Sequence, residues 1–225
     1  MLELRDLVKA YPSPAGDPVR ALDGLSLRIE AGELVALYGP SGSGKTTLLR
    51  IVAALMAPDS GEVVLDGREI SHLPPREAAR YRRLQLGYVS QAPDLLPGVS
   101  AIDNAALKLF ATRLGVREAR RRVAPILERL GLGERLQHRA EQLSTGQRQR
   151  VLVARALSTD PKLVLADEPT GSLDGERSAE VLALLTEVCD EQGVAMLLVT
   201  HDPQAADFAH GVRTLQGGRL VELPS

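Results

Sequence analysis

Apolar residues along the chain follow two spacings, one typical of β-strands and one typical of helices. Short alternating or continuous apolar runs between glycine, proline or polar residues predict strands and hairpins. These runs occupy residues 2–11, 25–31, 33–39, 61–70, 86–91, 162–167, 195–201 and 212–223. Apolar residues at helical spacing predict helices at residues 45–55, 74–84, 148–157 and 176–193. Residues 12–18, PSPAGDP, have the composition of a loop.

The order of these elements predicts an α/β fold. Strands that alternate with helices favour a mostly parallel sheet covered on both faces, and the first strands favour an N-terminal antiparallel β-subdomain. Residues 94–140 have an arginine-rich helical pattern without strand signals. We therefore expect one domain over residues 1–225, with a core formed by 1–93 and 141–225, which includes the antiparallel β-subdomain, and an inserted α-helical subdomain at about 94–140.

Composition narrows the class of protein. The net charge of −2 gives no general attraction to nucleic acid, and no nucleic-acid partner is expected. The single cysteine, Cys189, excludes a disulfide within the chain and a cysteine-based zinc cluster, and we expect it to be a buried, inert thiol. No apolar run is long enough to cross a bilayer, and the first residues have no secretory signal pattern.

A glycine-rich motif follows the strand at 33–39. GPSGSGKT at 39–46 matches the P-loop pattern, with the strand before it and the helix after it that this pattern requires. Its glycines let backbone N–H groups surround a phosphate, Lys45 supplies a cation for the β and γ oxygens, and the Thr46 hydroxyl suits Mg²⁺. The expected nucleotide-binding residues here are Gly39, Pro40, Ser41, Gly42, Ser43, Gly44, Lys45, Thr46 and Thr47.

Two adjacent carboxylates end a buried strand in KLVLADEPT at 162–170. Ligands of parallel sheets bind beyond the carboxyl ends of the strands, so Asp167 is expected to hold Mg²⁺. Pro169 disfavours the α region for Glu168, and we expect an extended backbone there that fixes the two carboxylates in different directions. Glu168 is then the candidate base for an attacking water molecule.

A second helix N-terminus suited to an anion follows a hundred residues after the P-loop, at LSTGQRQR. Ser144 and Gln147 have the spacing of a capping box, and Gly146 lies beside them. The P-loop, this motif and LVLADE occur in the order found in the ATP-binding subunits of ATP-binding cassette (ABC) transporters, which the chain resembles over nearly its whole length. The resemblance implies a P-loop NTPase core and a single ABC ATPase domain.

Further residues take their expected roles from this resemblance. Tyr11 would stack on adenine, Gln91 would touch Mg²⁺ and the attacking water, Asp174 would lie at a dimer interface, and His201 would contact the γ-phosphate. ATP and Mg²⁺ are the implied ligands. Two copies would bind head to tail, with Ser144, Thr145, Gly146 and Gln147 of one copy against the ATP of the other. The implied partner is a separate membrane permease, with the chain peripheral on the cytoplasmic face of the inner membrane.

Three points remain open at the level of sequence. Tyr11 has the alternative role of capping the N-terminal sheet. The arginines at 80–83 and 117–122 fit a solvated helix face, while the segment after Gln91 is also a candidate docking surface for the membrane partner. Thr145 stands where the family usually has glycine, so either this position has ordinary φ or the loop differs slightly. We expect nucleotide binding to survive this difference.

The motifs also separate members of the family. No guanine-reading N-K-x-D motif, long coiled coil, second cassette or C-terminal regulatory domain is found in the 225 residues. DEPTGSLD at 167–174 resembles the group of lipoprotein-release, macrolide-export and haem-export ATPases, which also contains the cell-division ATPase FtsE. The expected function is therefore an exporter-type ATPase, and the alternative is an FtsE-like ATPase that regulates a membrane partner without moving cargo.

Overall fold

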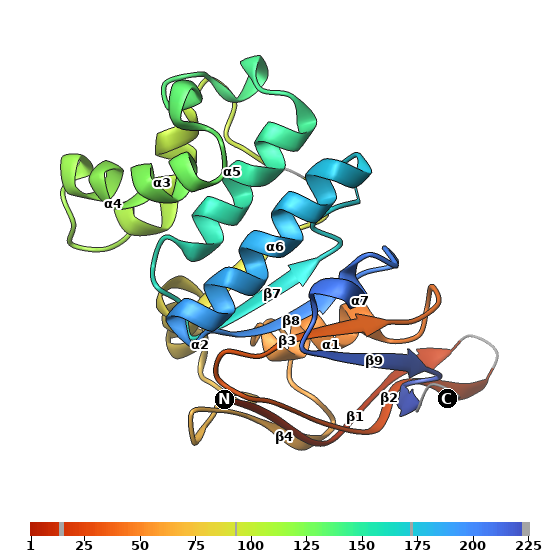
Figure 1. Ribbon diagram of the computed structural model, residues 1–225. Coiled ribbons are helices and arrows are strands. Elements are labelled where there is room, and N and C mark those ends of the chain that lie inside the picture. The colour runs from red at the N-terminus through yellow and green to blue at the C-terminus, as the bar shows by residue number, and fades with distance from the viewer. Residues whose placement is uncertain (14–15, 93, 172, 222–225) are drawn as a thin grey trace.

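Two β-sheets form the framework of the computed structural model, which describes residues 1–13, 16–92, 94–171 and 173–221 (Figure 1). The larger sheet has the order β10-β9-β3-β8-β7-β6. Its strands are β3 Leu34–Tyr38, β6 Leu86–Val89, β7 Leu163–Asp167, β8 Ala195–Val199, β9 Gly211–Gln216 and β10 Arg219–Val221. All neighbouring strands from β6 to β9 are parallel, and only β10 is antiparallel. The carboxyl ends of β3, β8, β7 and β6 therefore meet at one edge.

The smaller sheet is antiparallel, as the sequence predicts for the N-terminal strands. Its order is β2-β1-β4-β5, and the strands are β1 Leu2–Ser13, β2 Gly16–Ile29, β4 Ser60–Leu65 and β5 Arg68–Glu69. Asp66 and Gly67 join β4 to β5 with positive φ values of 49° and 76°, which confirms the predicted hairpin turn and gives it the type I′ form.

The loop predicted at 12–18 is wrong in extent, because β1 continues to Ser13 and β2 begins at Gly16. Residues 14–15 of that prediction lie outside the described residues. The strands tolerate their prolines because Pro18 lies on the edge strand β2, and Pro12 lies past Val8, the last residue of β1 paired with β4. Neither proline is therefore placed where a ladder hydrogen bond to β4 is needed.

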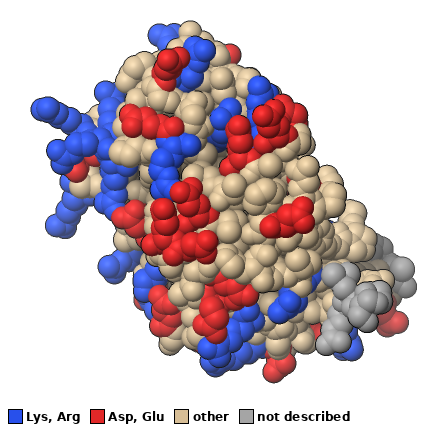
Figure 2. Space-filling model, viewed as in Figure 1, with Lys and Arg blue, Asp and Glu red and all other residues tan. Residues whose placement is uncertain are grey.

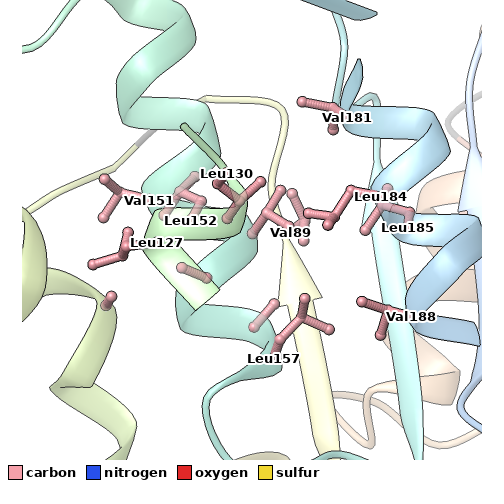
Figure 3. Close-up of a cluster of buried hydrophobic side chains, with 14 of the residues drawn as sticks. Val89, Leu127, Leu130, Val151, Leu152, Leu157, Val181, Leu184, Leu185 and Val188 are labelled. Carbon is pink, nitrogen blue, oxygen red and sulfur yellow. The ribbon is translucent and has the colours of Figure 1, made fainter. Parts of the chain in front are cut away.

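Alternate residues of the buried strands face two different cores. In β7, Leu163 and Leu165 join the core shared with the antiparallel sheet and α1 (Lys45–Val52), whereas Val164 and Ala166 join the core on the opposite face of the sheet. Figure 3 shows this second core, where side chains of α5 (Thr145–Leu157) and α6 (Gly175–Gln192) point toward one another across Val89 of β6. Burial on both faces explains the continuous apolar runs of these strands.

The described part of 94–140 is helical, in agreement with its sequence pattern. It contains α3 Ala101–Phe110, α4 Val116–Arg129 and the short 3₁₀ helices η1 Gly133–Arg135 and η2 Ala140–Gln142. These helices lie beside α5 (Figure 1), and Lys108 of α3 donates to the Leu86 carbonyl of β6. The remaining helices are α2 Pro75–Leu84 and α7 Ala205–Phe208. None of the helices among the described residues is long and apolar enough to span a membrane.

The arginines of α4 lie on the surface of this helical region. Figure 2 shows Lys and Arg side chains gathered over α4, with carboxylates between and beside them. Four of the five arginines of α4 form ion pairs: Arg120 with Asp103, Arg121 with Glu118, Arg122 with Asp160, and Arg129 with Glu187 and Glu191. The geometry agrees with a solvated helix face in which charge is largely compensated.

Helix α1 ends three residues before the predicted Leu55. Ala54 has a positive φ of 50°, its N–H donates to Ile51, and the N–H of Leu55 donates to Arg50. These two bonds form a Schellman motif, in which the left-handed residue is usually glycine. Because alanine gives no such signal, the sequence places the end too late. The motif directs Leu55 outward, where it is 60% exposed.

Cys189 lies in the buried face of α6, as expected from the sequence. Burial is the main cause that raises its pKa to about 12, and the charge of Asp190 adds to the effect. The thiolate that reacts with electrophiles is therefore scarce at neutral pH.

Candidate functional site

The P-loop between β3 and α1 is shaped by close contact with neighbouring strands. A β-carbon at Gly44 would lie 2.1 Å from the carbonyl oxygen of Ala21, and one at Gly39 would lie 2.3 Å from that of Leu215. Gly44 also has a φ of +109° and precedes the first residue of α1. Larger residues therefore cannot occupy these two positions. The loop packs closely against the neighbouring strands, and its backbone N–H groups are free of side chains that would block a bound phosphate.

Lys45 lies over its own loop. Its Nζ donates to the carbonyl oxygens of Gly39 at 2.6 Å and Pro40 at 2.8 Å. The next residue, Thr46, has an exposed side chain, whereas Thr47 and Ser43 are buried. The Ser43 hydroxyl has no hydrogen-bond partner among the described residues. The cation and the Thr46 hydroxyl thus lie at the same opening of the loop.

The strand ends bring the predicted residues from separate parts of the sequence to one cavity of about 580 Å³. Gln91 follows β6, Asp167 ends β7 and is followed by Glu168, and His201 comes two residues after β8. The cavity is lined by Ala21, Gly39, Pro40, Ser41, Gly42, Gly44, Lys45, Thr46, Thr47, Gln91, Asp167, Glu168 and His201. The four parallel strands that precede these residues are adjacent in the sheet, which explains their convergence.

Glu168 has a different backbone conformation from the one predicted. Its φ is +49°, in the left-handed region, and the extended conformation expected from Pro169 is wrong. Proline disfavours the right-handed α region but leaves this other turn available. The N–H of Glu168 still donates to Val199, so the chain turns only after β7 has paired with β8. This costly conformation turns the chain at a cavity residue, where such strain is often found.

Three groups from the end of β8 hold the Glu168 carboxylate. The Thr200 hydroxyl and the His201 N–H each donate to Oε2 at 3.2 Å, and His201 Nδ1 lies 2.8 Å from Oε1. The Glu168 side chain is 12% exposed, whereas that of His201 is 75% exposed. The carboxylate is therefore fixed in direction, while the imidazole remains accessible from the cavity.

Asp167 lies in a less polar environment than its neighbour. Burial raises the pKa of Asp167 first, the charge of Glu168 raises it further, and Lys45 lowers it. Its carboxylate accepts no hydrogen bond from the described residues. A half-buried carboxylate without donors suits a cation ligand better than a structural partner.

Helix α5 begins at the second predicted anion site, outside this cavity. Ser144 accepts from the N–H of Gln147 at 3.2 Å, and Gln147 Oε1 accepts from the N–H of Ser144 at 3.0 Å, which confirms the capping box. Ser144 and Thr145 are exposed, and Gly146 is buried, where a β-carbon would lie 2.8 Å from Leu173. Thr145 is the first residue of the helix and is absent from the residues with positive φ, so the first of the two alternatives for this position holds.

Tyr11 and Asp174 have contacts within the chain. The Tyr11 hydroxyl lies 3.3 Å from Thr47 Oγ1 and donates to Met56, so this strand residue touches α1 without lining the cavity. Asp174 is the N-cap of α6, where it accepts from the N–H of Arg177 and pairs with that guanidinium.

Sequence reasoning missed two residues of this site. Thr200 orients Glu168 through its hydroxyl, and the only sequence signal was its position between the β8 strand and His201. Ala21 lines the cavity from β2, next to Gly44 of the P-loop. The sequence pattern assigns no element to this residue, so nothing marked it as part of the site.

Comparison with known proteins agrees with this geometry. The model of the ABC transporter family matches residues 22–171. The chain belongs to the ABC transporter family. It is 46% identical over 220 residues to the lipoprotein-releasing system ATP-binding protein LolD 2 of Caulobacter vibrioides, with 98% of this chain and 96% of the relative covered. It is 43% identical to the macrolide export ATP-binding/permease protein MacB of Hyphomonas neptunium, covering 98% of this chain but only 34% of that longer protein.

A solved ABC cassette has the same fold. The dimeric post-hydrolysis structure of the cassette MJ0796, bound to ADP and Pi, has a TM-score of 0.89 and 35% identity, and covers 99% of this chain and 97% of that chain. The predicted α/β fold with a P-loop NTPase core is thereby confirmed, as is the resemblance to the lipoprotein-release and macrolide-export group. As a member of this family, the chain is an ATP-binding and ATP-hydrolysing transporter subunit.

Proposed function

We propose that this ABC ATPase acts as a pair of identical subunits that close on two ATP molecules and drive a separate, exporter-type membrane permease. The observation that carries the proposal is the convergence of the P-loop, Gln91, Asp167, Glu168 and His201 on one cavity. Each residue supplies a group that phosphoryl transfer to water requires.

The P-loop binds the nucleotide. Backbone N–H groups of residues 39–47 surround the phosphates, and Lys45 exchanges its two loop carbonyl partners for the β and γ oxygens. Tyr11 is the proposed adenine contact. Its position on β1 beside Thr47 agrees with a base bound next to the start of α1.

The remaining donors fit Mg²⁺. The hydroxyl of Thr46, the amide oxygen of Gln91 and the carboxylate of Asp167 are hard oxygen ligands, all in the lining of the cavity. When bound, the ion would neutralise charge on the phosphate oxygens. Asp167 carries its charge at a cost because burial raises its pKa, and a nearby cation offsets that cost.

Glu168 is the proposed base for the attacking water, with Gln91 and His201 beside it. Thr200 and the His201 N–H orient the Glu168 carboxylate, so that its remaining lone pairs point away from the β8 end. His201, which is exposed, contacts the γ-phosphate of the bound nucleotide, and Gln91 orients the water.

The second copy supplies the N-terminus of α5. Ser144, Thr145, Gly146 and Gln147 do not line the cavity of their own chain, yet they begin a helix whose capping serine is exposed. A helix N-terminus of this kind binds anions, and the γ-phosphate held by a second copy is the proposed anion. The dimeric assembly of the similar cassette supports this arrangement. Asp174 is the proposed residue at the dimer interface.

A groove between α1, β6, α3 and α5 is the proposed contact with the permease. It is lined in part by Leu55 and Tyr88, which are 60% and 39% exposed, and by Lys108 and Arg155. Exposed large apolar side chains around one groove are typical of a surface covered by a partner. The groove adjoins the segment after Gln91, so a partner there would respond to the nucleotide site.

The proposed location follows from the partner. The chain would be peripheral, on the cytoplasmic face of the inner membrane, where its permease holds it. The names of the similar proteins, a lipoprotein-releasing and a macrolide-exporting ATP-binding protein, favour transport out of the membrane or the cell.

Replacement of Glu168, the proposed base, tests whether hydrolysis and dimerisation are linked. Glu168→Gln keeps the shape of the side chain but cannot accept a proton from water, so hydrolysis should fall by about a hundredfold or more. ATP then remains between the two copies, and light scattering should report a stable dimer with MgATP and a monomer without it. A Glu168→Gln variant that stays monomeric with ATP and hydrolyses it at the normal rate would contradict these roles.

A further inference from the structure

Gln149 is a fully buried amide that connects helix α5 to the segment that carries Gln91. It lies on α5 with 0% of its surface exposed. Its Nε2 donates to the backbone carbonyl of Ser90 at 3.0 Å. Ser90 directly precedes Gln91, and Gln149 lies one and a half helical turns after Ser144. The bond therefore links the Gln91 backbone to the helix that begins at the capping box.

The amide is kept in the core although only half of it is paired. Gln149 Oε1 is buried and has no hydrogen-bond partner among the described residues. An unpaired buried carbonyl destabilises the folded state, and a leucine or methionine in this place would avoid that cost. The cost of the unpaired Oε1 indicates that the Nε2 donor has a role that an apolar residue cannot supply.

Further polar contacts hold the segment that follows Gln91. Arg155, also on α5, donates to the carbonyl of Asp94 at 3.1 Å and to Asn104 of α3. Asn104, with 0% exposure, accepts from the N–H of Leu96 at 2.8 Å. Within the segment, the Ser90 hydroxyl donates to the carbonyl of Ala92 at 2.9 Å. Among the described contacts with α5, the Gln149 bond is the one that holds the residue next to Gln91.

We infer that Gln149 is a positioning residue for hydrolysis: it fixes the Ser90 carbonyl, and thereby Gln91, relative to the start of α5. The inference rests on the proposed roles of Gln91 and Ser144. A movement of α5 toward or away from a second copy would then move Gln91 within its own cavity. The contact thus couples the phosphate site of one copy to the phosphate site of the other.

Replacement by methionine separates this role from packing. Gln149→Met keeps the length of the side chain, removes the donor and removes the unpaired carbonyl. We expect kcat to fall about tenfold, the effect of one buried hydrogen bond, with nucleotide affinity unchanged and Tm equal or higher. Thr159→Val is the matched control, because Thr159 also carries a buried unpaired oxygen but does not line the cavity. It should leave kcat unchanged.

A double-mutant cycle with Gln91→Ala tests whether Gln149 acts through Gln91. If it does, the double variant Gln91→Ala/Gln149→Met hydrolyses ATP as slowly as Gln91→Ala alone. Losses that multiply would overturn the inference. An unchanged kcat in Gln149→Met, alongside a reduced kcat in Gln91→Ala, would overturn it while leaving the proposed function intact. An unchanged kcat in Gln91→Ala would instead remove the proposed role of Gln91, and the inference with it.

A pH profile gives a readout that a packing role would not move. In Gln149→Glu, the protonated carboxyl can donate to the Ser90 carbonyl, whereas the ionised form cannot. The ratio of kcat in this variant to kcat in the unmodified protein should therefore rise as the pH falls. A ratio that stays constant across the pH range in which the variant remains folded would contradict the positioning role.

Discussion

Glu168 shows how far a functional residue depends on its backbone and not only on its side chain. Its type and position could be predicted from the strand that precedes it, but its left-handed φ of +49° could not, since Pro169 excludes only one region. The contacts from Thr200 and His201 depend on β8 lying next to β7, which no local pattern specifies. Residue identities at the site were therefore predictable, and the hydrogen bonds that orient them were not.

Asp167 is expected to support hydrolysis at a cost in the stability of the folded protein. Folding raises its pKa, so its ionised form destabilises the native state above that pKa, and the penalty disappears once the carboxyl is protonated at lower pH. Asp167→Asn should raise Tm at neutral pH, with a difference that shrinks on acidification, and should abolish Mg²⁺-dependent hydrolysis. Thermal unfolding of both proteins without nucleotide, across the pH range, checks the sign. A lower Tm for the variant at neutral pH would contradict it.

Thr145 should be nearly neutral for hydrolysis. It begins α5 with ordinary helical geometry, so restoring the glycine that is usual in the family relieves no strain. Thr145→Gly should change ATPase activity by less than about threefold and lower stability by up to about 1 kcal/mol, because glycine is a weak helix former. Steady-state hydrolysis and chemical denaturation measure the two effects. A large increase in ATPase activity would show that the threonine restrains the loop.

At the scale of elements, a helix boundary was predictable where the residues carry a local signature. Helical spacing alone placed the start of α5 at residue 148, three residues too late. The capping box at the start of α5 has a local signature, and the structure forms it as predicted. The end of α1 depends on Ala54 in a conformation that usually requires glycine, so no residue type signals this end. Strand β6 ends at Val89, two residues before the predicted end at Gln91, because β7 pairs with it only as far as Val89.

Among the described residues, two helices are capped by a serine, and replacing each serine can separate an effect on helix stability from an effect on ligand binding. Ser144 caps α5 and Ser100 caps α3, each by accepting from a backbone N–H of the first turn. Ser144→Ala and Ser100→Ala should each cost about 1 kcal/mol of unfolding free energy. Only Ser144→Ala should weaken ATP-dependent dimerisation when each is combined with Glu168→Gln, as measured by light scattering. Equal effects on dimerisation would argue against contact between Ser144 and a nucleotide.

At the scale of the whole molecule, the proposed permease groove lies beside the segment between β6 and α3, because Arg155 of the groove donates to the carbonyl of Asp94 in that segment. The cavity uses Gln91 at one end of this segment, and the groove is bounded by Tyr88 and Arg155 near it. The fold class and the helical region followed from the order of elements in the sequence. The groove did not, because it depends on how α1, α3 and β6 meet.

A charge introduced into the groove should abolish binding to the permease without changing ATP hydrolysis. Leu55→Asp places a carboxylate on an exposed apolar residue, so the fold and the ATPase activity of the isolated chain should be unchanged. Co-purification with the membrane permease should be lost. Val116→Asp is the matched control, since Val116 is 55% exposed and lies outside the groove. Loss of association in both variants, or in neither, would place the contact elsewhere.

The burial of Cys189 gives a practical way to measure how two copies of the chain approach each other. The chain has one cysteine, and its thiol is buried and rarely ionised. Maleimide dyes should therefore not react with it. A cysteine introduced at an exposed position such as Val116 would then carry a fluorophore without removal of the native residue. Energy transfer between two labelled copies could follow their approach and separation through successive rounds of nucleotide turnover, in real time.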